Sequence, residues 1–278
     1  MPELPEVETI VRRLRSSVMG RRIVAFHSRC AKQARPNVAA VRRAVVGQTI
    51  AQLGRRGKYI VFYLEHSGFL LVHLGMSGRL GVLSNDDQSP RHVRASWELD
   101  DGNRLLLSDA RKFGRIEHVA DLAAATAGLG IEPLSSAFTA AWLAAELRKR
   151  SRQLKPLLLD QSLIAGLGNI YVDESLFRAG VHPLTRCDRL DRRQTAALHR
   201  AIREVLREAI RYEGTSFDWA YRGGRMQARL KVYGRAGEPC RRCRTPIAYL
   251  RVSQRGTHIC PRCQPAPRSD RTEPAEQP

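Results

Sequence analysis

Four cysteines near the end of the chain have the type and spacing of a metal site. Cys240 and Cys243 form a C-x2-C pair, sixteen residues follow, and Cys260 and Cys263 form a second pair. Two such pairs can place four thiolates around one tetrahedral Zn2+ ion. The alternative is two disulfides or two redox pairs. Because the amino terminus lacks the apolar segment of a secretory signal, we expect a reducing compartment and one structural zinc ion.

The other thiols and the nearby histidine are expected to lie outside this metal site. Four sulfurs saturate a structural zinc ion, so His258 is not predicted to be a ligand. Cys30 and Cys187 stand alone in the sequence and are expected to be packed free thiols.

A second chemistry is available at the amino terminus, where Pro2 follows Met1 and precedes Glu3 and Glu6. Methionine is usually removed before a small residue such as proline, and its removal exposes a secondary amine. An α-amino group has a reference pKa near 7.7–8.0, so a sizeable fraction is neutral and nucleophilic at pH 7. Such an amine can attack a sugar aldehyde carbon and form an iminium ion, while carboxylates move protons. The alternative is an ordinary helix start, with acids in the first turn.

The charge balance indicates a polyanionic partner. The 278 residues contain 47 Lys plus Arg against 27 Asp plus Glu, which gives a net charge of +20. Between Arg222 and Arg262 there are eleven basic residues and one acid, Glu238. Nucleic acid is the first candidate and an anionic membrane surface the second. No apolar run approaches the roughly 20 residues that a spanning helix needs.

The helices and strands that must position the cysteines and the amino-terminal residues fall into two parts of the chain. The first has mainly β patterns and the second mainly helical ones, which predicts an α+β fold. Residues 7–18 carry a helical apolar stripe, and residues 59–74 and 93–108 have the pattern of two β-hairpins. We therefore expect residues 1–131 to form a domain with one helix and a β-sandwich or barrel. Helical spacing follows, over 138–150, 154–160, 169–179 and 191–212.

The expected domain boundaries follow from these changes of pattern. Residues 132–236 are predicted to form a helical domain that ends in a basic loop with a short strand. Residues 237–264 form the zinc finger, and the Pro-rich tail 265–278 is expected to be disordered.

Five stretches, in order along the chain, resemble the formamidopyrimidine-DNA glycosylase and endonuclease VIII family of base excision repair enzymes. They are MPELPEVE at the start, HLGMSGRL at 73–80, SDARKFGRIE at 108–117, KPLLLDQSLIAGLGNIYVDE at 155–174, and the finger ending GTHICPRCQ. The resemblance covers residues 1 to about 264. It implies that residues 1–131 are a catalytic β-sandwich domain and that residues 132–236 are a helix-two-turn-helix DNA-binding domain, followed by the zinc finger.

The resemblance implies roles for five catalytic residues. Pro2 corresponds to the nucleophile, Glu3 to the acid that protonates the opening deoxyribose, and Glu6 to a second carboxylate that positions water or the lesion. Lys58 corresponds to a lysine that contacts phosphate near the lesion. Arg255 corresponds to the finger arginine that clamps the phosphates of the flipped nucleotide.

The same resemblance implies a set of DNA-binding residues. His73 corresponds to a phosphate contact, and Asn169 opens the helix whose amino terminus holds a phosphate. Lys155 belongs to the same stretch and is assigned to DNA binding. The residues that fill the hole left by the extruded base correspond to Met76, Arg111 and Phe113. An apolar wedge and a guanidinium in the minor groove offset part of the lost stacking.

One segment departs from the family pattern. The wedge residues resemble the branch that acts on oxidised purines, yet the stretch 217–227 is about four residues shorter than is usual there. Arg225 and Met226 also replace the aromatic pair that is common in this branch. The sequence therefore leaves open which damaged base the enzyme prefers.

The sequence as a whole predicts a bifunctional DNA glycosylase and abasic-site lyase for oxidised purines, acting by β,δ-elimination. Its expected partner is damaged double-stranded DNA, with no membrane, and we expect a monomer in the cytoplasm, associated with the nucleoid in a bacterium. Two alternatives stand beside it. One is an endonuclease VIII-like enzyme for oxidised pyrimidines, and the other is a non-catalytic zinc-ribbon protein that binds nucleic acid.

Overall fold

The computed structural model describes residues 2–84, 87–215 and 223–267. The chain packs into two units, each built from several segments. The first contains residues 1–133, 161–167 and 206–229, and the second contains the remainder. In the described segments, no helix combines the length and apolar character that a membrane span requires.

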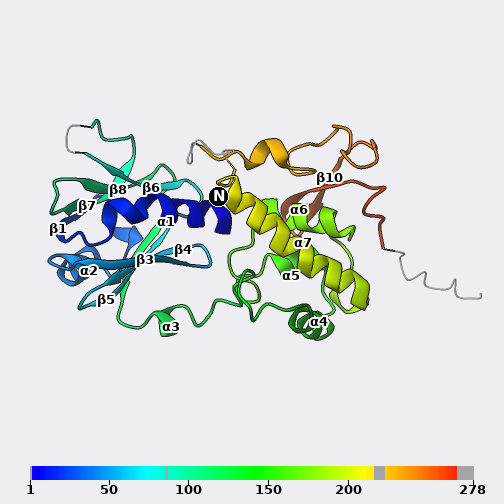
Figure 1. The fold of residues 1–278 in the computed structure, drawn as a ribbon, viewed down its shortest axis with the longest axis horizontal. Helices are drawn as coiled ribbons and strands as arrows, with labels where there is room; N and C mark the ends of the chain where they lie inside the picture. Colours follow the sequence, from blue (N-terminus) through cyan, green and yellow to red (C-terminus); the bar gives the residue numbers. More distant parts are fainter. Residues whose placement is uncertain (1, 85–86, 216–222, 268–278) are drawn as a thin grey trace, which may run out of the picture. The chain divides into compact units, whose positions relative to one another are not determined.

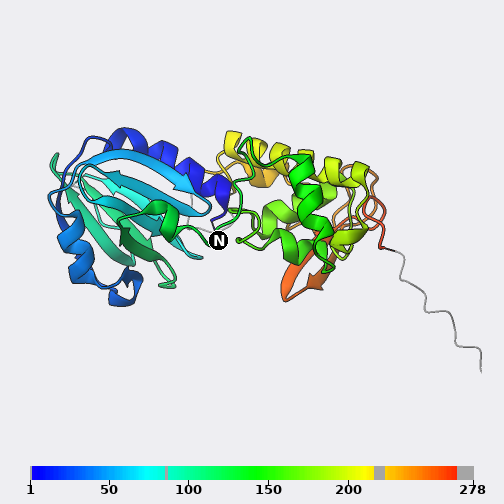
Figure 2. The ribbon, with the colours of Figure 1, turned by 90° about the horizontal axis from the view of Figure 1, so that it is seen from below.

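The first unit contains a β-sandwich, as the hairpin patterns predicted (Figures 1 and 2). One sheet has the strand order β1-β7-β8-β6, and the other has the order β2-β9-β5-β4-β3. The first sheet consists of β1 (Ile23–Ser28), β7 (Val93–Leu99), β8 (Arg104–Asp109) and β6 (Gly78–Leu83). The second consists of β2 (Ala34–Arg35), β9 (Arg115–Val119), β5 (Gly68–His73), β4 (Tyr59–Leu64) and β3 (Ile50–Arg56).

Two helices cover the open edges of this sandwich. Helix α1 (Leu4–Val18) packs on β3 and β6, the edge strands on one side. Helix α2 (Val38–Val45) packs on β1, β2 and β9 at the opposite side, after a short 3-10 turn, η1 (Ala31–Gln33). Covered edges leave few unpaired backbone groups exposed to other chains. The core between the layers is centred on large side chains such as Phe26 and Trp97, whose rings lie 5.2 Å apart.

The second unit is mainly helical. Its helices are α4 (Ala140–Arg148), α5 (Leu154–Leu158) and α6 (Asn169–Ala179), with a short 3-10 turn, η2 (Cys187–Arg189). Helix α6 has the predicted bounds because glycines delimit it: Gly168 is its amino-terminal cap, and Gly180 ends it with φ of 70°. Helix α7 (Arg192–Arg211) begins in this unit and ends in the first. The remaining short helix, α3 (Leu122–Ala125), belongs to the first unit.

The carboxyl-terminal part of the second unit is a small finger. Strands β10 (Ala248–Val252) and β11 (Arg255–Ile259) pair antiparallel. Their turn places Ser253 and Gln254 at positive φ. The short strand expected within 214–236 does not occur in the described part of that range, which instead forms a 3-10 turn, η3 (Met226–Arg229). Residues 268–278 of the expected disordered tail lie outside the described residues.

Candidate active site and nucleic-acid interface

The amino-terminal acids hold the start of α1 in one conformation. Glu3 and Glu6 form a reciprocal capping box, in which the Glu3 N–H donates to Glu6 Oε2 at 2.9 Å. Both side chains are buried, 2% and 3% exposed. The other Glu6 oxygen accepts from the Thr215 N–H at 2.8 Å. Glu3, the expected proton donor, therefore follows Pro2 directly, and Glu6, the carboxylate expected to position water or the lesion, is held beside it.

The approach of the segment around residue 214 depends on a glycine. Gly214 has φ of 74°, and a Cβ at this position would lie 2.6 Å from Glu6 Oε1. No side chain can occupy that space without displacing the carboxylate. The backbone that follows α7 is thus brought close enough to bind Glu6 through Thr215.

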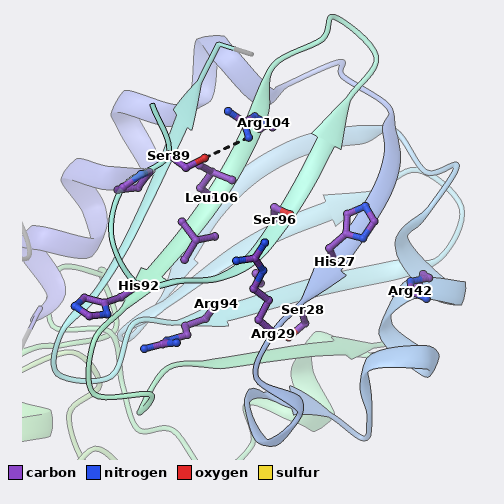
Figure 3. Close-up of a pocket in the computed structure, with 13 residues that line it drawn as sticks. His27, Ser28, Arg29, Arg42, Ser89, His92, Arg94, Ser96, Arg104 and Leu106 are labelled. Carbon is purple, nitrogen blue, oxygen red and sulfur yellow. Dashed lines mark hydrogen bonds between the residues drawn. The ribbon is translucent and has the colours of Figure 1, made fainter. Parts of the chain in front are cut away.

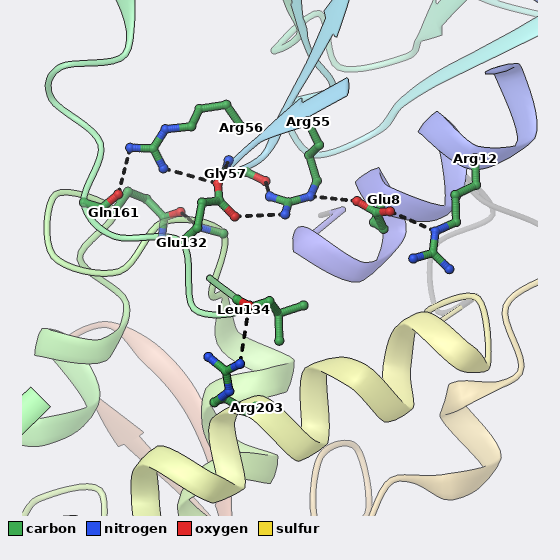
Figure 4. A network of polar contacts seen from close by, with 11 residues as sticks. Glu8, Arg12, Arg55, Arg56, Gly57, Glu132, Leu134, Gln161 and Arg203 are labelled. Carbon is green, nitrogen blue, oxygen red and sulfur yellow. Dashed lines mark hydrogen bonds and ion pairs between the residues drawn. The ribbon is translucent and has the colours of Figure 1, made fainter. Parts of the chain in front are cut away.

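The turn that precedes Lys58 in the chain is held by the side chain of Glu132, which Figure 4 shows beside Gly57. Glu132 accepts hydrogen bonds from the Gly57 N–H at 2.6 Å and from the guanidinium groups of Arg55 and Arg56. Arg55 also reaches Glu8 on α1 at 3.2 Å. Because the residue before it is tethered and its own side chain is 8% exposed, Lys58 has little conformational freedom.

His73 lies at the end of β5, opposite Tyr59 on the neighbouring strand. Burial, together with the positive charges of Lys58 and Arg115, lowers the pKa of His73 to about 4. Its Nδ1 accepts from the Gly75 N–H at 3.1 Å, so the neutral ring carries its proton on Nε2. His73 can therefore donate one neutral hydrogen bond to an anion above about pH 5.

The three wedge residues lie on two loops that meet at one buried carboxylate. Asp109 accepts from the Ser77 hydroxyl at 2.6 Å, from the Gly114 N–H at 2.8 Å and from the Arg111 N–H at 3.2 Å. Asp109 is fully buried. It joins the loop that carries Met76 to the loop that carries Arg111 and Phe113.

The wedge side chains themselves are exposed. Met76 is 38% exposed and Phe113 is 51% exposed, although both are large and apolar. The Arg111 guanidinium lies over the Phe113 ring, 4.9 Å from its centroid. Gly75 lets the two loops approach, since a Cβ there would lie 2.6 Å from the Phe113 carbonyl carbon.

We expect Asp109→Ala to separate these loops. The substitution leaves several buried donors without an acceptor, at a cost of about 3 kcal/mol or more in the free energy of unfolding. Urea denaturation measures this loss, and 2-aminopurine fluorescence beside an abasic site measures wedge insertion. The control is Asp101→Ala, which removes a carboxylate from an exposed turn. If wedge insertion is unchanged in Asp109→Ala, Asp109 does not determine the positions of the wedge residues.

In the second unit, Lys155 is enclosed by protein. Its ammonium group lies 2.6 Å from Asp173 Oδ1, 2.8 Å from Thr257 Oγ1 and 3.0 Å from the Gly256 carbonyl oxygen. The side chains of Lys155 and Asp173 are both 0% exposed. The three N–H donors of the ammonium group already point at protein acceptors, so this geometry favours an indirect part for Lys155 in the expected DNA binding.

Lys155 and Asn169 instead converge on the finger hairpin. Asn169 Nδ2 also donates to the Gly256 carbonyl, at 2.9 Å, and Asp173 accepts from the His258 N–H at 2.9 Å. The side chains of Lys155, Asn169 and Asp173 thus hold the backbone of β11. Arg255, the first residue of this strand, is exposed. We infer that Lys155 positions Arg255 by fixing the next two residues.

Lys155→Met is expected to lower the free energy of unfolding by about 3–5 kcal/mol, because Asp173 is left buried without its cation. Urea denaturation measures the change. Lys149→Met, which removes an exposed lysine paired with Glu146, is expected to cost less than about 1 kcal/mol. Adding Asp173→Asn to Lys155→Met should recover part of the loss. If Lys155→Met is as stable as Lys149→Met, the ammonium does not act as a structural cation.

The four cysteines are arranged as one metal site. Their sulfurs all lie within 4.8 Å of one another. The closest pairs are Cys243–Cys260 at 3.4 Å and Cys243–Cys263 at 3.5 Å, and Cys240–Cys263 is 4.0 Å. A tetrahedral Zn2+ ion with bonds of about 2.3 Å requires sulfurs about 3.8 Å apart, so the cluster fits one structural zinc ion. Burial raises the pKa of Cys187, outside the cluster, to about 11, in keeping with a packed thiol.

Three acids that organise the site were not singled out by sequence analysis: Asp109, Glu132 and Asp173. Asp109 and Asp173 do lie inside the stretches that carry the family resemblance. Glu132 lies at the change of pattern near residue 131 and has no local signal. Residues 216–222, most of the shortened stretch 217–227, lie outside the described residues.

Three family models match consecutive parts of the chain. The formamidopyrimidine-DNA glycosylase N-terminal domain matches residues 1–116, and the H2TH domain of the same enzymes matches residues 129–220. A zinc finger found in FPG and IleRS matches residues 237–266. In this order they define a base excision repair enzyme with its own zinc finger. The chain belongs to the formamidopyrimidine-DNA glycosylase family.

Individual relatives agree over nearly the whole chain. Formamidopyrimidine-DNA glycosylases of Chloroflexus aggregans and Herpetosiphon aurantiacus are 45% and 42% identical, over 95% of this chain and 98% and 100% of theirs. The Lactococcus lactis enzyme bound non-covalently to DNA with an abasic site has a TM-score of 0.90 and 35% identity. A MutM complex with DNA containing carbocyclic 8-oxoguanine has a TM-score of 0.91 and 34% identity. Both structures are covered completely, by 95% of this chain.

Proposed function

We propose that this glycosylase removes oxidised purines from duplex DNA and cuts the strand through a covalent intermediate on Pro2. After removal of Met1, the Pro2 nitrogen is a secondary amine and attacks C1′ of the damaged nucleotide. The C1′–base bond breaks, the base leaves with a proton, and the deoxyribose ring opens to an iminium ion. The iminium accepts electrons as β- and then δ-elimination expel the two phosphates.

The observation that carries this proposal is the buried Glu3–Glu6 pair immediately after Pro2. Glu3 is assigned the proton that the ring oxygen needs when the sugar opens. Glu6 is held by Thr215 and by the Glu3 N–H, so its carboxylate stays in place while water or the lesion is positioned. General acid–base groups in fixed geometry typically contribute a factor of about 10²–10⁴ to the rate.

The remaining side chains are assigned to the DNA. Lys58 and His73 bind phosphates of the damaged strand, while Met76, Arg111 and Phe113 fill the space left by the flipped nucleotide. The amino terminus of α6 and Arg255 bind phosphates from the second unit. We propose that the enzyme acts as a monomer on damaged double-stranded DNA at the bacterial nucleoid.

Borohydride trapping tests this function. An abasic-site duplex, incubated with the protein and sodium borohydride, should give a covalent protein–DNA band, whereas an undamaged duplex should not. A non-catalytic zinc-ribbon protein would bind the duplex and give no band. An endonuclease VIII-like enzyme would trap the abasic site but release oxidised pyrimidines faster than oxidised purines.

Lesion choice gives a further prediction. A short loop at Gly223–Gly224 supplies few polar groups to the 8-oxo edge of a purine, and discriminating so small a change requires such groups. Formamidopyrimidines and hydantoins stack more weakly and should flip at lower cost. We expect single-turnover excision of formamidopyrimidine or hydantoin to exceed that of 8-oxoguanine in matched duplexes. Faster excision of 8-oxoguanine opposite cytosine would contradict the argument from the short loop, but it would leave the proposed chemistry of Pro2 unaffected.

A further inference from the structure

The four-stranded sheet carries a cavity of about 650 Å³ on the face turned away from the sandwich core (Figure 3). Along β7, Ala95 and Trp97 belong to the core, so Arg94 and Ser96 face the opposite side. The cavity lies between these side chains, strand β1 and the segment 89–92. Neither the catalytic carboxylates nor the phosphate contacts assigned above line it.

The cavity is strongly basic. Its lining includes Arg29, Arg42, Arg94 and Arg104. None of these arginines forms an ion pair with a carboxylate in the described ranges of the chain. The nearby acid Glu98 lies 3.4 Å from His27 Nε2 instead. Four guanidinium groups around one concavity, with no acid in its lining, create a local field that attracts anions.

Two of the guanidinium groups are oriented by the backbone. Arg42 Nε donates to the Phe26 carbonyl at 3.0 Å, and Arg94 Nε donates to the Asp109 carbonyl at 2.9 Å. Bonds through Nε leave the terminal amino groups available as a fork. A fixed guanidinium fork matches two oxygens of a phosphate group.

Arg104 adds a donor that lacks an acceptor. Its terminal nitrogens donate to Ser89 Oγ and to the Asp87 carbonyl, both at 3.3 Å. Its Nε is buried and has no hydrogen-bond partner among the described residues. A buried donor in this state is unfavourable by about 1–3 kcal/mol unless a ligand or water accepts from it.

The cavity continues the surface that carries the wedge. Pro90 and His92 line it, and they also line the adjacent smaller cavity together with Met76 and Arg111. We propose that the arginine cavity binds a backbone phosphate of the DNA duplex near the lesion. This proposal rests on the proposed function, since it takes the DNA to lie on the wedge surface.

The test measures DNA binding against salt for two matched double variants. Arg29→Gln with Arg42→Gln removes two charges from the cavity, and both side chains are exposed. Arg22→Gln with Arg43→Gln removes two exposed charges elsewhere in the same unit. Each neutralised phosphate contributes about 0.9 to the slope of log K against log salt. On an abasic-analogue duplex, the cavity variant should lose about 0.9 of slope, the contribution of one phosphate, and the control should keep the wild-type slope.

Stability and the source of phosphate are checked separately. The urea midpoint of the control variant should match the wild type, and that of the cavity variant should fall only slightly, because Arg42→Gln removes one hydrogen bond to the Phe26 carbonyl. The single variant Arg29→Gln, whose side chain makes no hydrogen bond within the described segments, should lose up to about 0.9 of slope. Equal slopes for the cavity and control variants overturn the proposal. If the slopes are equal and calorimetry shows that pyrophosphate binds the wild type but not the cavity variant, the cavity is a site for free phosphate. That result also overturns the proposal. Borohydride trapping by the wild type tests the proposed function independently.

Discussion

Replacing Pro2 by Gly should lower the rate of borohydride trapping on an abasic-site duplex by roughly 10²-fold. The pyrrolidine ring restricts the terminal residue and makes its nitrogen a secondary amine, whereas a terminal glycine is free to rotate. A misplacement of about 1 Å in a reacting atom can cost a factor of this size. Glu3 and Glu6 remain bound to each other, so the variant keeps its fold.

A protein that retains Met1 gives a stronger form of the same test. Its Pro2 nitrogen is a tertiary amide, which is not nucleophilic, so trapping should be lost while duplex binding remains. Intact mass spectrometry identifies the two forms. Pro267→Gly, at an exposed position, serves as the control and should trap at the wild-type rate. Full lyase activity from a protein with confirmed Met1 would exclude Pro2 as the nucleophile.

Cys243→Ser should release zinc and unfold the finger over residues 238–264. The apolar core of the finger is small: its buried members are Phe177, Val232, Cys240, Ile247 and Cys260. Two of these are zinc ligands, so the metal is part of the core. Zinc binding in such modules corresponds to about 10–16 kcal/mol of apparent free energy at pH 7, which the remaining side chains cannot replace.

Hydrogen exchange and zinc content measure the result. Amides of β10 and β11 should exchange rapidly in Cys243→Ser, while amides of β4 and β5 in the sandwich keep their protection. Cys187→Ser removes a buried thiol outside the cluster and should retain zinc. Arg255→Ala should also retain zinc, but it should reduce the salt slope of DNA binding by about one unit. A protected, ordered finger in zinc-free Cys243→Ser would refute the structural role of the metal.

The elements that sequence analysis placed correctly are those with local signals. Helix α6 begins and ends as predicted because glycines flank its apolar pattern, and the hairpin of β4 and β5 follows from two apolar runs joined by a short turn. The cysteine spacing likewise identified the zinc site, since each C-x2-C pair is a local unit. The expected short strand after α7 does not occur in the described part of its range, where the 3-10 turn η3 lies instead.

Tertiary structure alone decided which polar groups share a site. Glu132 meets Arg55 from 77 positions away, and Lys155 meets Thr257 from 102 positions away. No periodic pattern encodes such pairs, because each partner looks like an ordinary surface charge until the chain folds. Sequence analysis assigned Lys155 to DNA binding, and its burial supports our inference that it acts there by positioning Arg255. The sequence by itself therefore determined the family, the nucleophile hypothesis and the metal ligands, whereas packing determined how those groups are held and where the arginines gather.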